Sequence, residues 1–464
     1  MTGPNIRRRS MVVAIAAGAI LATVPAGCVS SAVPSPSAAV TSTAAVTTAA
    51  GPSTSAPRST TPRSTTKRST PPAPLPPGGP VTDADIAAAT AAVTAMSVPE
   101  RAGSVIMASS ADAVGSDLVA RLHLGGVILM GSSGAIDGTG RGTPSQVAEV
   151  TGQLQSQVPA AQAKAPLLIG TDQEYGLVTR LVNGFTDFPG ATELSAIPNP
   201  KSAAQATERV TSAAGSELRA VGVNVDFAPD ADVLPESGDS NMADRSFGSD
   251  PERVGDLVAA AVRGYQSAGV AATLKHFPGI GRLAADTHKS LPTLDVTCDE
   301  WNTVEAVPMR AGVDAGAAIV MTGHVLLPAV GDTRGPSSLS SAVVTDLLRG
   351  AGLGGCQGLG FHGVSVSDSL QMAPVANRYR SGQAAARALT AGQDLVLMPV
   401  DPKAALAGIV GAVKDGSLRA ARLQEAAVRV YALRLALARA PRPGLRVVGS
   451  QAHEAIAAQA RAAG

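Results

Sequence analysis

One stretch of the chain combines the side-chain types that carry out acid–base chemistry. The apolar run 269–274 leads into Lys275 and His276, and Asp286 and His288 follow in a loop that contains glycine. A single loop histidine is usually an ordinary surface residue, but a carboxylate two residues before it can fold back against the ring. That carboxylate stabilises the charged ring and fixes its tautomer. The pattern therefore predicts a proton donor near the end of a buried strand.

The elements that would position these side chains recur eight times. Each is a short run rich in Val, Ile and Leu, followed by a loop and then by an Ala-rich segment with helical periodicity. The runs cover residues 103–108, 126–130, 167–171, 223–227, 270–275, 318–322, 364–367 and 394–398. Such apolar runs are typical of strands buried on both faces, and intervening helices require parallel connections. We therefore predict an α/β fold, a single (β/α)8 barrel of the TIM type, with a doubly wound open sheet as the alternative.

Polar residues gather at the ends of these runs. They are Asp172, Asp226, Asp230, Lys275, His276, His324 and Asp368. Taken singly, each could be a strand-end residue that hydrogen-bonds a loop amide. In a (β/α)8 barrel, however, the carboxyl ends of all strands meet on one face, where active sites lie. Several such residues in equivalent places predict an active site on that face.

The N-terminus has the pattern of an export signal. Three arginines at 7–9 precede an apolar core, residues 11–24, which is too short to span a bilayer. Gly27-Cys28 resembles the lipobox of bacterial lipoproteins, although Pro25 stands where that motif prefers Leu or Val. We therefore expect residues 1–27 to be a signal peptide and a lipid on Cys28 to anchor the exported protein to the outer face of the cell membrane. The alternative is a secreted protein in which Cys28 is an incidental thiol.

Beyond the signal, composition divides the chain into three parts. Residues 28–80 are mostly Ser, Thr, Ala and Pro, so they cannot bury a core and are expected to form a disordered tether. Residues 81–440 contain all eight apolar runs and form the predicted barrel domain. Residues 441–464 are an Ala-rich tail that we expect to be helical at its end.

The charge of the predicted domain argues against a nucleic-acid partner. The whole chain has 37 Lys and Arg against 36 Asp and Glu, but its first 80 residues hold seven basic residues and no acidic one. The remainder therefore has 30 basic against 36 acidic residues, a net charge of −6. Binding to nucleic acid requires clustered Lys and Arg, commonly with aromatic residues, which are only 2% of this chain.

Two cysteines, Cys298 and Cys356, remain after the signal and tether. In an exported protein they could form one disulfide, and Cys356 lies in a Gly-rich stretch that is able to reach a partner. Two independent buried thiols are equally compatible with the spacing.

Six motifs together resemble glycoside hydrolase family 3, and within it the β-N-acetylhexosaminidases of the NagZ type, including lipoprotein members from mycobacteria and related actinobacteria. The motifs are Thr171-Asp172-Gln173-Glu174, Asp244-Arg245-Ser246-Phe247-Gly248, Lys275-His276-Phe277-Pro278-Gly279, Asp286-Thr287-His288, Met321-Thr322-Gly323-His324-Val325 and Ser367-Asp368-Ser369-Leu370-Gln371-Met372. Their order and spacing match the family over nearly all of residues 81–440. The resemblance implies a retaining exo-β-N-acetylglucosaminidase that acts on peptidoglycan fragments.

The resemblance also implies roles for individual residues. Asp368 corresponds to the nucleophile that forms a covalent glycosyl-enzyme, and His288, oriented by Asp286, corresponds to the acid/base. The residues that correspond to the N-acetylglucosamine-binding side chains are Asp172, Arg180, Arg245, Lys275 and His276.

The chain departs from the family pattern at three places. Tyr175-Gly176-Leu177 stands where Gly-Gly-Arg is usual, Ile280 where a His is usual, and Ser369 where Asp is common. These departures concern the preference for the aglycone, the leaving part of the substrate, more than the chemistry.

The implied roles are physically consistent with one another. A retaining glycosidase needs a carboxylate under the anomeric carbon and a proton donor above the glycosidic oxygen, and a His can be that donor. The nucleophile must stay ionised, so we expect Lys275 and Arg245 to lower the pKa of Asp368. The partner is then a saccharide or muropeptide that contains N-acetylglucosamine. We expect no cofactor and no metal, and a monomer.

Three other functions compete with this interpretation. A glycoside phosphorylase could also use a His, which repels phosphate less than a carboxylate does. A metal-dependent barrel hydrolase would use His276, Asp286, His288 and His324 as ligands, but residues 108–110 read Ala-Ser-Ser where a first-strand His-x-His is typical. A non-catalytic wall-binding lipoprotein would have lost Asp368 or the Asp286/His288 pair, and the chain retains both.

Overall fold

The computed structural model of the chain describes residues 78–132, 135–136, 141–331 and 333–464. These residues belong to one compact unit, residues 71–464. The expected signal peptide, the lipidated Cys28 and most of the expected tether lie outside the described residues. In the described part of the chain, no helix is both long and apolar enough to cross a membrane.

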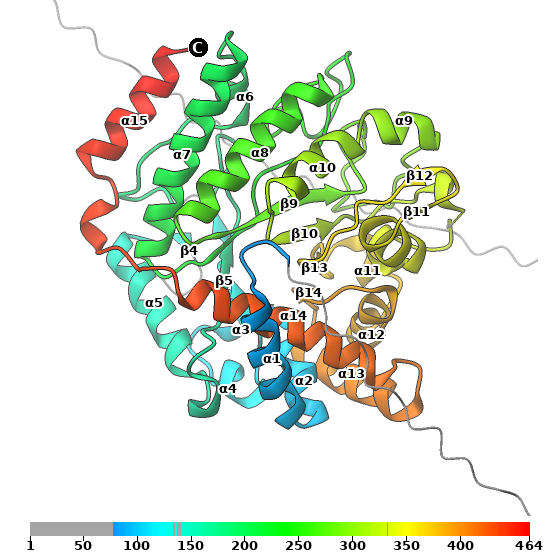
Figure 1. Cartoon of the computed structure of the whole chain (residues 1–464). Coiled ribbons are helices and arrows are strands. Elements are labelled where there is room, and N and C mark those ends of the chain that lie inside the picture. The colour runs from blue at the N-terminus through cyan, green and yellow to red at the C-terminus, as the bar shows by residue number, and fades with distance from the viewer. Residues whose placement is uncertain (1–77, 133–134, 137–140, 332) are drawn as a thin grey trace, which may run out of the picture. The chain divides into compact units, whose positions relative to one another are not determined.

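Eight parallel strands form the centre of the fold (Figure 1). They are β1 (Ile106–Ser109), β2 (Gly126–Ile128), β5 (Leu168–Thr171), β8 (Val225–Asp226), β9 (Ala271–Phe277), β10 (Ile319–Thr322), β13 (Val364–Ser367) and β14 (Val396–Leu397). From β1 to β13, each barrel strand pairs with the next barrel strand along the chain, and β14 pairs with β1. A bridge between Val366 of β13 and Leu395, directly before β14, joins the two outer strands of this series. The sheet therefore closes, which confirms the (β/α)8 barrel and excludes the open doubly wound sheet.

Helices precede and surround the strands (Figure 1). They are α1 (Asp83–Ala95), α2 (Val98–Ser104), α3 (Ser110–Ala113), α4 (Leu118–Leu122), α5 (Pro144–Ser156), α6 (Ala191–Ser195), α7 (Pro200–Ala220), α8 (Pro251–Ser267), α9 (Cys298–Thr303), α10 (Ala306–Asp314), a π-helical segment (Ala342–Arg349), α11 (Ala373–Ala376), α12 (Ser381–Ala391), α13 (Pro402–Asp415), α14 (Ala420–Ala438) and α15 (Gln451–Ala462). Three long helices begin alike, with Asn199, Asp250 and Asp401 capping free N–H groups and proline at the next position. Neighbouring helices pack together, as α7 does on α8 and α1 on α14.

The barrel strands are rich in apolar residues because both of their faces are buried. Along β10, Ile319 and Met321 belong to the core inside the barrel, whereas Val320 between them packs in the outer core against the helices. In β1, Met107 likewise lies inside the barrel. Successive side chains of a strand point to opposite faces. Burial of both faces therefore explains why Val, Ile and Leu are so frequent in the strands.

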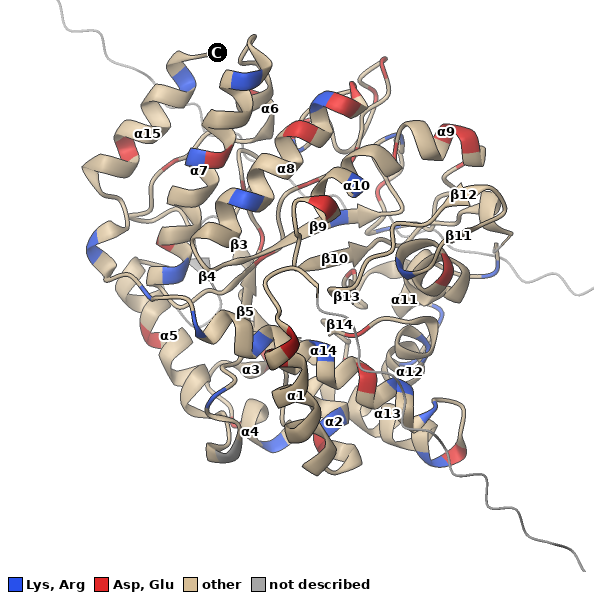
Figure 2. Cartoon of the chain, in the orientation of Figure 1, with Lys and Arg blue, Asp and Glu red and all other residues tan. Residues whose placement is uncertain are grey.

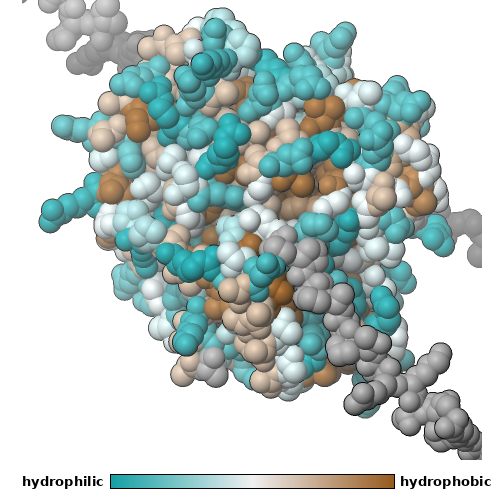
Figure 3. Space-filling view, in the orientation of Figure 1, coloured by the Kyte–Doolittle hydropathy of each residue, from teal (hydrophilic) through white to brown (hydrophobic). Residues whose placement is uncertain are grey.

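Charged residues lie mainly on helices and loops, as Figure 2 shows for one face of the molecule. On the same face, apolar residues form small patches separated by hydrophilic ones (Figure 3). One charged cluster lies inside the protein. Asp394 is fully buried just before β14 and forms ion pairs with Arg349, Arg422 and Arg429. This cluster lies at the amino end of the strand, opposite the end that carries the predicted active site.

Three short hairpins extend from the barrel. They are β3 (Gly131–Ser132) with β4 (Ala135–Ile136), β6 (Gln173–Tyr175) with β7 (Val178–Thr179), and β11 (Gly352–Leu353) with β12 (Cys356–Gln357). A disulfide joins Cys298, the first residue of α9, to Cys356 in β12, so of the two expectations for these cysteines the disulfide is confirmed.

The C-terminal tail contains the helix that its Ala content predicted. This helix, α15, packs against α7. Arg461 in it forms ion pairs with Asp187 and Glu193, which follow the β6–β7 hairpin.

Candidate active site

All eight side chains that the sequence assigned to catalysis or sugar binding line one cavity of about 610 Å³. They are Asp172, Arg180, Arg245, Lys275, His276, Asp286, His288 and Asp368. They lie at the end of β9 or in segments that follow the carboxyl ends of β5, β8, β9 and β13. The predicted convergence on one face of the barrel is therefore confirmed.

Asp368 stands at the first position after β13 and is half-buried in the cavity wall. Its backbone N–H donates to the carbonyl of Thr322 at the end of β10, at 2.9 Å. Its Oδ1 accepts the Ser369 N–H at 2.7 Å. The barrel itself therefore fixes the position of this carboxylate, and one backbone dipole stabilises its negative charge.

The pKa of Asp368 is lowered from its usual range, in the expected direction. Burial alone would raise this pKa, but His324, His276 and the Ser369 N–H lower it by more. The expected cause was wrong, because Lys275 and Arg245 are engaged by other carboxylates. Burial lowers the pKa of His276 and of His324, which disfavours the charged form of both rings, so the Ser369 backbone N–H is a support that does not depend on their protonation.

His288 and Asp286 form the expected pair in the loop after β9. Oδ1 of Asp286 accepts both the backbone N–H of His288 and its ring N–H at Nδ1, each at 2.9 Å. The His288 N–H lowers the pKa of Asp286 to about 2, so this carboxylate is ionised and the contacted ring nitrogen must be the donor. The His288 side chain is 70% exposed, and its Nε2 stays available for substrate. The His288 carbonyl accepts the N–H of Ala373, which ties this loop to the segment after Asp368.

Glu174 organises the cations of the cavity. Its carboxylate accepts hydrogen bonds from Nε and Nη2 of Arg245, at 2.8 and 2.7 Å, and lies 2.6 Å from Nζ of Lys275. Lys275 also contacts Asp172 at 3.0 Å. Burial would raise the pKa of Glu174, but Lys275 and Arg245 lower it to about 2. Both cations therefore stay charged and have fixed positions although they are largely buried.

Arg180 follows the β6–β7 hairpin and lies 3.6 Å from Asp172. Its Nη1 also donates to the carbonyl of Gly131 at 3.1 Å. Asp172 therefore contacts Lys275 on one side and Arg180 on the other, as a residue shared between two sugar-binding cations would.

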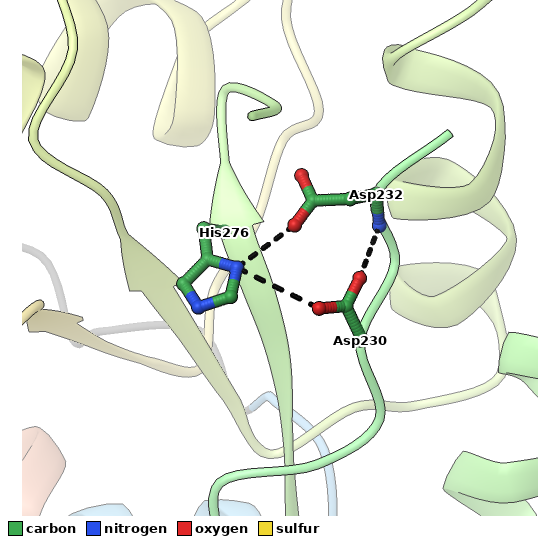
Figure 4. A group of neighbouring side chains, drawn as sticks. All are labelled: Asp230, Asp232 and His276. Atoms are coloured by element: carbon green, nitrogen blue, oxygen red, sulfur yellow. Dashed lines mark hydrogen bonds and ion pairs between the residues drawn. The ribbon is translucent and has the colours of Figure 1, made fainter. Parts of the chain in front are cut away.

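His276 faces two buried aspartates, as Figure 4 shows. Its Nδ1 lies 2.8 Å from Asp232 and 3.8 Å from Asp230. Burial lowers the pKa of His276 to about 4, so the ring is neutral and its Nδ1–H donates to Asp232. Burial and the neighbouring Asp232 raise the pKa of Asp230 to about 8. The unprotonated Nε2 of His276 can therefore accept a hydrogen bond from a sugar hydroxyl.

The ligand set of the metal-dependent alternative does not come together. Among the described residues, the group with donor atoms close enough to share an ion is Asp230, Asp232 and His276, not the set of His276, Asp286, His288 and His324. His324 is instead fully buried, with Nδ1 2.7 Å from the Ser338 hydroxyl and Nε2–H donating to the carbonyl of Ser369 at 2.9 Å. It holds the loop of Asp368 in place.

Glu174 and Asp232 were not assigned roles from the sequence. Each carried a weak signal, because each stands two positions after an aspartate at a strand end, Asp172 and Asp230. In extended backbone such a spacing places both side chains on the same side. Of the other strand-end residues, Asp226, Asp230 and His324 are buried and do not line the cavity.

Comparison with known proteins decides the family. The model of the glycosyl hydrolase family 3 N-terminal domain matches residues 97–433. The chain belongs to glycosyl hydrolase family 3. It is therefore a glycoside hydrolase, and the resemblance inferred from the six motifs is confirmed.

Relatives in this family are named for activity on hexosaminides. Beta-hexosaminidase A of Pseudoalteromonas piscicida is 32% identical over 297 residues, which are 61% of this chain and 47% of that protein. Beta-hexosaminidase LpqI of Mycobacterium tuberculosis is 32% identical over 336 residues, 70% of this chain and 78% of that protein. The solved family 3 beta-N-acetylglucosaminidase of Paenibacillus sp. str. FPU-7 has a TM-score of 0.70 and 35% identity, covering 79% of this chain and 68% of that one. The chain thus spans about half of the first relative and most of the other two.

Proposed function

We propose that this glycoside hydrolase is a retaining exo-β-N-acetylglucosaminidase that removes terminal N-acetylglucosamine from peptidoglycan fragments. The observation that carries the proposal is that an ionised carboxylate, Asp368, and a histidine held by a carboxylate, His288, line one cavity with three paired cations. The names of the relatives support the sugar, since they are hexosaminidases or N-acetylglucosaminidases.

In the first step, a carboxylate oxygen of Asp368 attacks the anomeric carbon of the substrate. The bond from that carbon to the glycosidic oxygen breaks, and the leaving oxygen takes the proton from Nε2 of the doubly protonated His288 ring. Asp286 accepts the hydrogen bond from Nδ1 throughout, so it stabilises the ring while the ring is charged. The products are the free aglycone and a glycosyl ester of Asp368.

In the second step, water attacks the same carbon and gives its proton to Nε2 of His288. The ester bond to Asp368 breaks, the carboxylate is regenerated and the ring is again doubly protonated. Two inversions at one carbon retain its configuration.

The paired cations would hold the sugar while the bonds change. Lys275, Arg245 and Arg180 present N–H donors, and Asp172 and the neutral Nε2 of His276 present acceptors. Because each cation already contacts a carboxylate, its position is fixed before substrate arrives.

The test compares an aryl N-acetylglucosaminide, an aryl glucoside and a peptidoglycan digest, each with and without phosphate, with Asp368→Ala as the inactive control. The proposal predicts free N-acetylglucosamine from the first and third substrates, without dependence on phosphate. Comparable turnover of the glucoside would refute the sugar assignment. A sugar phosphate as product would establish the phosphorylase alternative.

We also propose that the protein is exported and anchored through a lipid on Cys28, on the evidence of the first 28 residues alone. Wild-type protein should then partition into a detergent phase, and Cys28→Ala should move it to the aqueous phase. Equal partitioning of both proteins would contradict the anchor.

A further inference from the structure

We propose that the cavity contains an apolar aglycone subsite at the tip of the β6–β7 hairpin, centred on Leu177. It would accept a β-N-acetylglucosaminide whose aglycone is neutral and apolar close to the bond that is cleaved. This inference rests on the proposed removal of terminal N-acetylglucosamine, and it extends the leaving groups from the hydroxylated, acid-bearing sugars of peptidoglycan fragments to apolar ones.

The first observation is the exposure of Leu177. Its exposed fraction is 67%, the largest among the exposed large apolar residues in the described part of the chain. A single exposed leucine on an outer surface needs no explanation. Leu177, however, lines the cavity that contains Asp368 and His288, so a bound substrate can cover it.

The second observation is that the hairpin holds Leu177 in this position. Tyr175 and Gly176 both have a φ of +64°, and the Tyr175 ring is buried edge-on against Phe188, with 5.4 Å between the ring centroids. The hydroxyl of Thr179 donates to the carbonyl of Gly176 across the turn, at 3.1 Å. Tyr175 is thus the buried side chain of the turn, and Leu177 is the exposed one.

The third observation is that other apolar side chains line the cavity with Leu177. Five of the ten methionines of the chain line the same cavity, together with Ile280 and Leu283. The methionines are Met130, Met242, Met321, Met372 and Met398. Methionine side chains are flexible and polarisable, so such a lining can adapt to apolar groups of different shape.

The fourth observation is that, among the residues that the structure describes, every Lys or Arg that lines the cavity is already paired with a carboxylate. The Lys and Arg residues that line it are Arg180, Arg245 and Lys275, and each forms an ion pair with Asp172 or Glu174. Leu177 and Ile280, two aliphatic side chains, line the same cavity. An acidic aglycone would therefore meet aliphatic side chains and cations that are already paired.

Alkyl N-acetylglucosaminides test the subsite, because lengthening the alkyl chain changes the apolar surface of the leaving group and hardly changes its acidity. For the wild type we expect kcat/KM for the octyl glycoside to exceed that for the methyl glycoside at least tenfold, since several buried CH2 groups contribute. A glycoside of similar length that ends in a carboxylate should be a poorer substrate than the octyl compound.

The variants locate the effect. Leu177→Ser should lower the octyl-to-methyl ratio of kcat/KM about tenfold, the expected result of losing one apolar contact surface. Leu177→Arg should lower the same ratio and raise turnover of the carboxylate-ended glycoside relative to the octyl one. The matched control is Val182→Ser, because Val182 is 42% exposed in the following segment but does not line the cavity, and it should leave the ratio unchanged.

Two results would overturn the inference while leaving the proposed function intact. One is a wild-type enzyme that cleaves an aryl N-acetylglucosaminide but treats methyl and octyl glycosides alike. The other is Leu177→Ser with an unchanged ratio. If the wild type cleaved no N-acetylglucosaminide at all, the proposed function would fail and the subsite would fail with it.

Discussion

Glu174 holds Arg245 by two parallel hydrogen bonds, from Nε at 2.8 Å and from Nη2 at 2.7 Å, so that both carboxylate oxygens are used. One of these oxygens also contacts Nζ of Lys275. A single buried acid thus fixes two of the cations that line the cavity. Neither cation is free to support Asp368, which is instead stabilised by its own loop.

Replacing Glu174 by Gln should destabilise the fold at neutral pH by about 3–5 kcal/mol, because two buried cations lose the counter-charge that they share and Lys275 keeps only Asp172. The pKa of Glu174 is about 2 in the folded protein and 4.5 ordinarily. A lowered carboxylate pKa contributes stability above the ordinary value, and this contribution is lost as pH falls toward the folded value. The difference in unfolding free energy between wild type and Glu174→Gln should therefore be full at pH 6 and shrink below about pH 4.5.

Denaturant unfolding between pH 3 and pH 7 measures that difference. The control is Glu208→Gln, since Glu208 forms an exposed pair with Arg263 at 2.9 Å and should contribute little at any pH. A difference for Glu174→Gln that did not change with pH would contradict the charge assignment.

His288→Ala should slow substrates with poor leaving groups by about 10²–10⁴, the usual effect of losing positioned proton transfer. Substrates whose leaving group needs no proton should still form the glycosyl-enzyme and then stall, because the same ring activates water. Asp286→Asn should show a milder form of both effects. Lys289→Ala is the control, because Lys289 contacts Asp286 but is 83% exposed. Equal losses for good and poor leaving groups, without accumulated intermediate, would make His288 a positioning residue only.

The buried cluster around Asp394 should matter for stability rather than for turnover. Asp394→Asn removes the charge that pairs with Arg349, Arg422 and Arg429, so we expect a loss of about 3–5 kcal/mol in unfolding free energy. The kcat/KM of the molecules that remain folded should change less than twofold, because the cluster lies at the amino end of β14. The exposed Asp415→Asn is the comparison. A large fall in kcat at unchanged stability would contradict this division.

The C-terminal tail should stabilise the segment after the β6–β7 hairpin. Glu217 is fully buried and accepts hydrogen bonds from Thr186 on one side and from Gly449 and His453 of the tail on the other. His453→Ala leaves one of these bonds unmade, at a cost of about 1–3 kcal/mol. Hydrogen exchange should then speed up around Thr186 more than in β9. Unchanged exchange at Thr186 would show that the tail does not support this segment.

The barrel could be predicted because its signal is local and repeated. Strands buried on both faces are largely apolar, so runs such as 126–130 and 318–322 stand out from the Ala-rich helices around them. Residues directly after such strands, like Asp368, could also be predicted to belong to one site, because the barrel brings the strand ends together. The pair of Asp286 and His288 could be read from a spacing of two residues.

The partners of these residues could not be predicted, because they depend on contacts between distant segments. Glu174 accepts a hydrogen bond from Arg245, which lies 71 residues away in the sequence. Asp232 is hydrogen-bonded to His276, which lies 44 residues away. The expectation that Lys275 and Arg245 would lower the pKa of Asp368 failed for the same reason. Charges near a site can be listed from a sequence, but which carboxylate engages each of them is decided by packing.

Trapping the covalent intermediate shows whether Asp368 is the nucleophile of an N-acetylglucosaminidase. A fluorinated N-acetylglucosaminyl substrate with a good leaving group, incubated with the wild-type enzyme, slows both steps and allows the ester to accumulate. Mass spectrometry of the intact protein and its peptides should show one added sugar, located on Asp368, and no label on Asp368→Asn. A sugar found on another carboxylate, or turnover without any covalent adduct, would contradict the account.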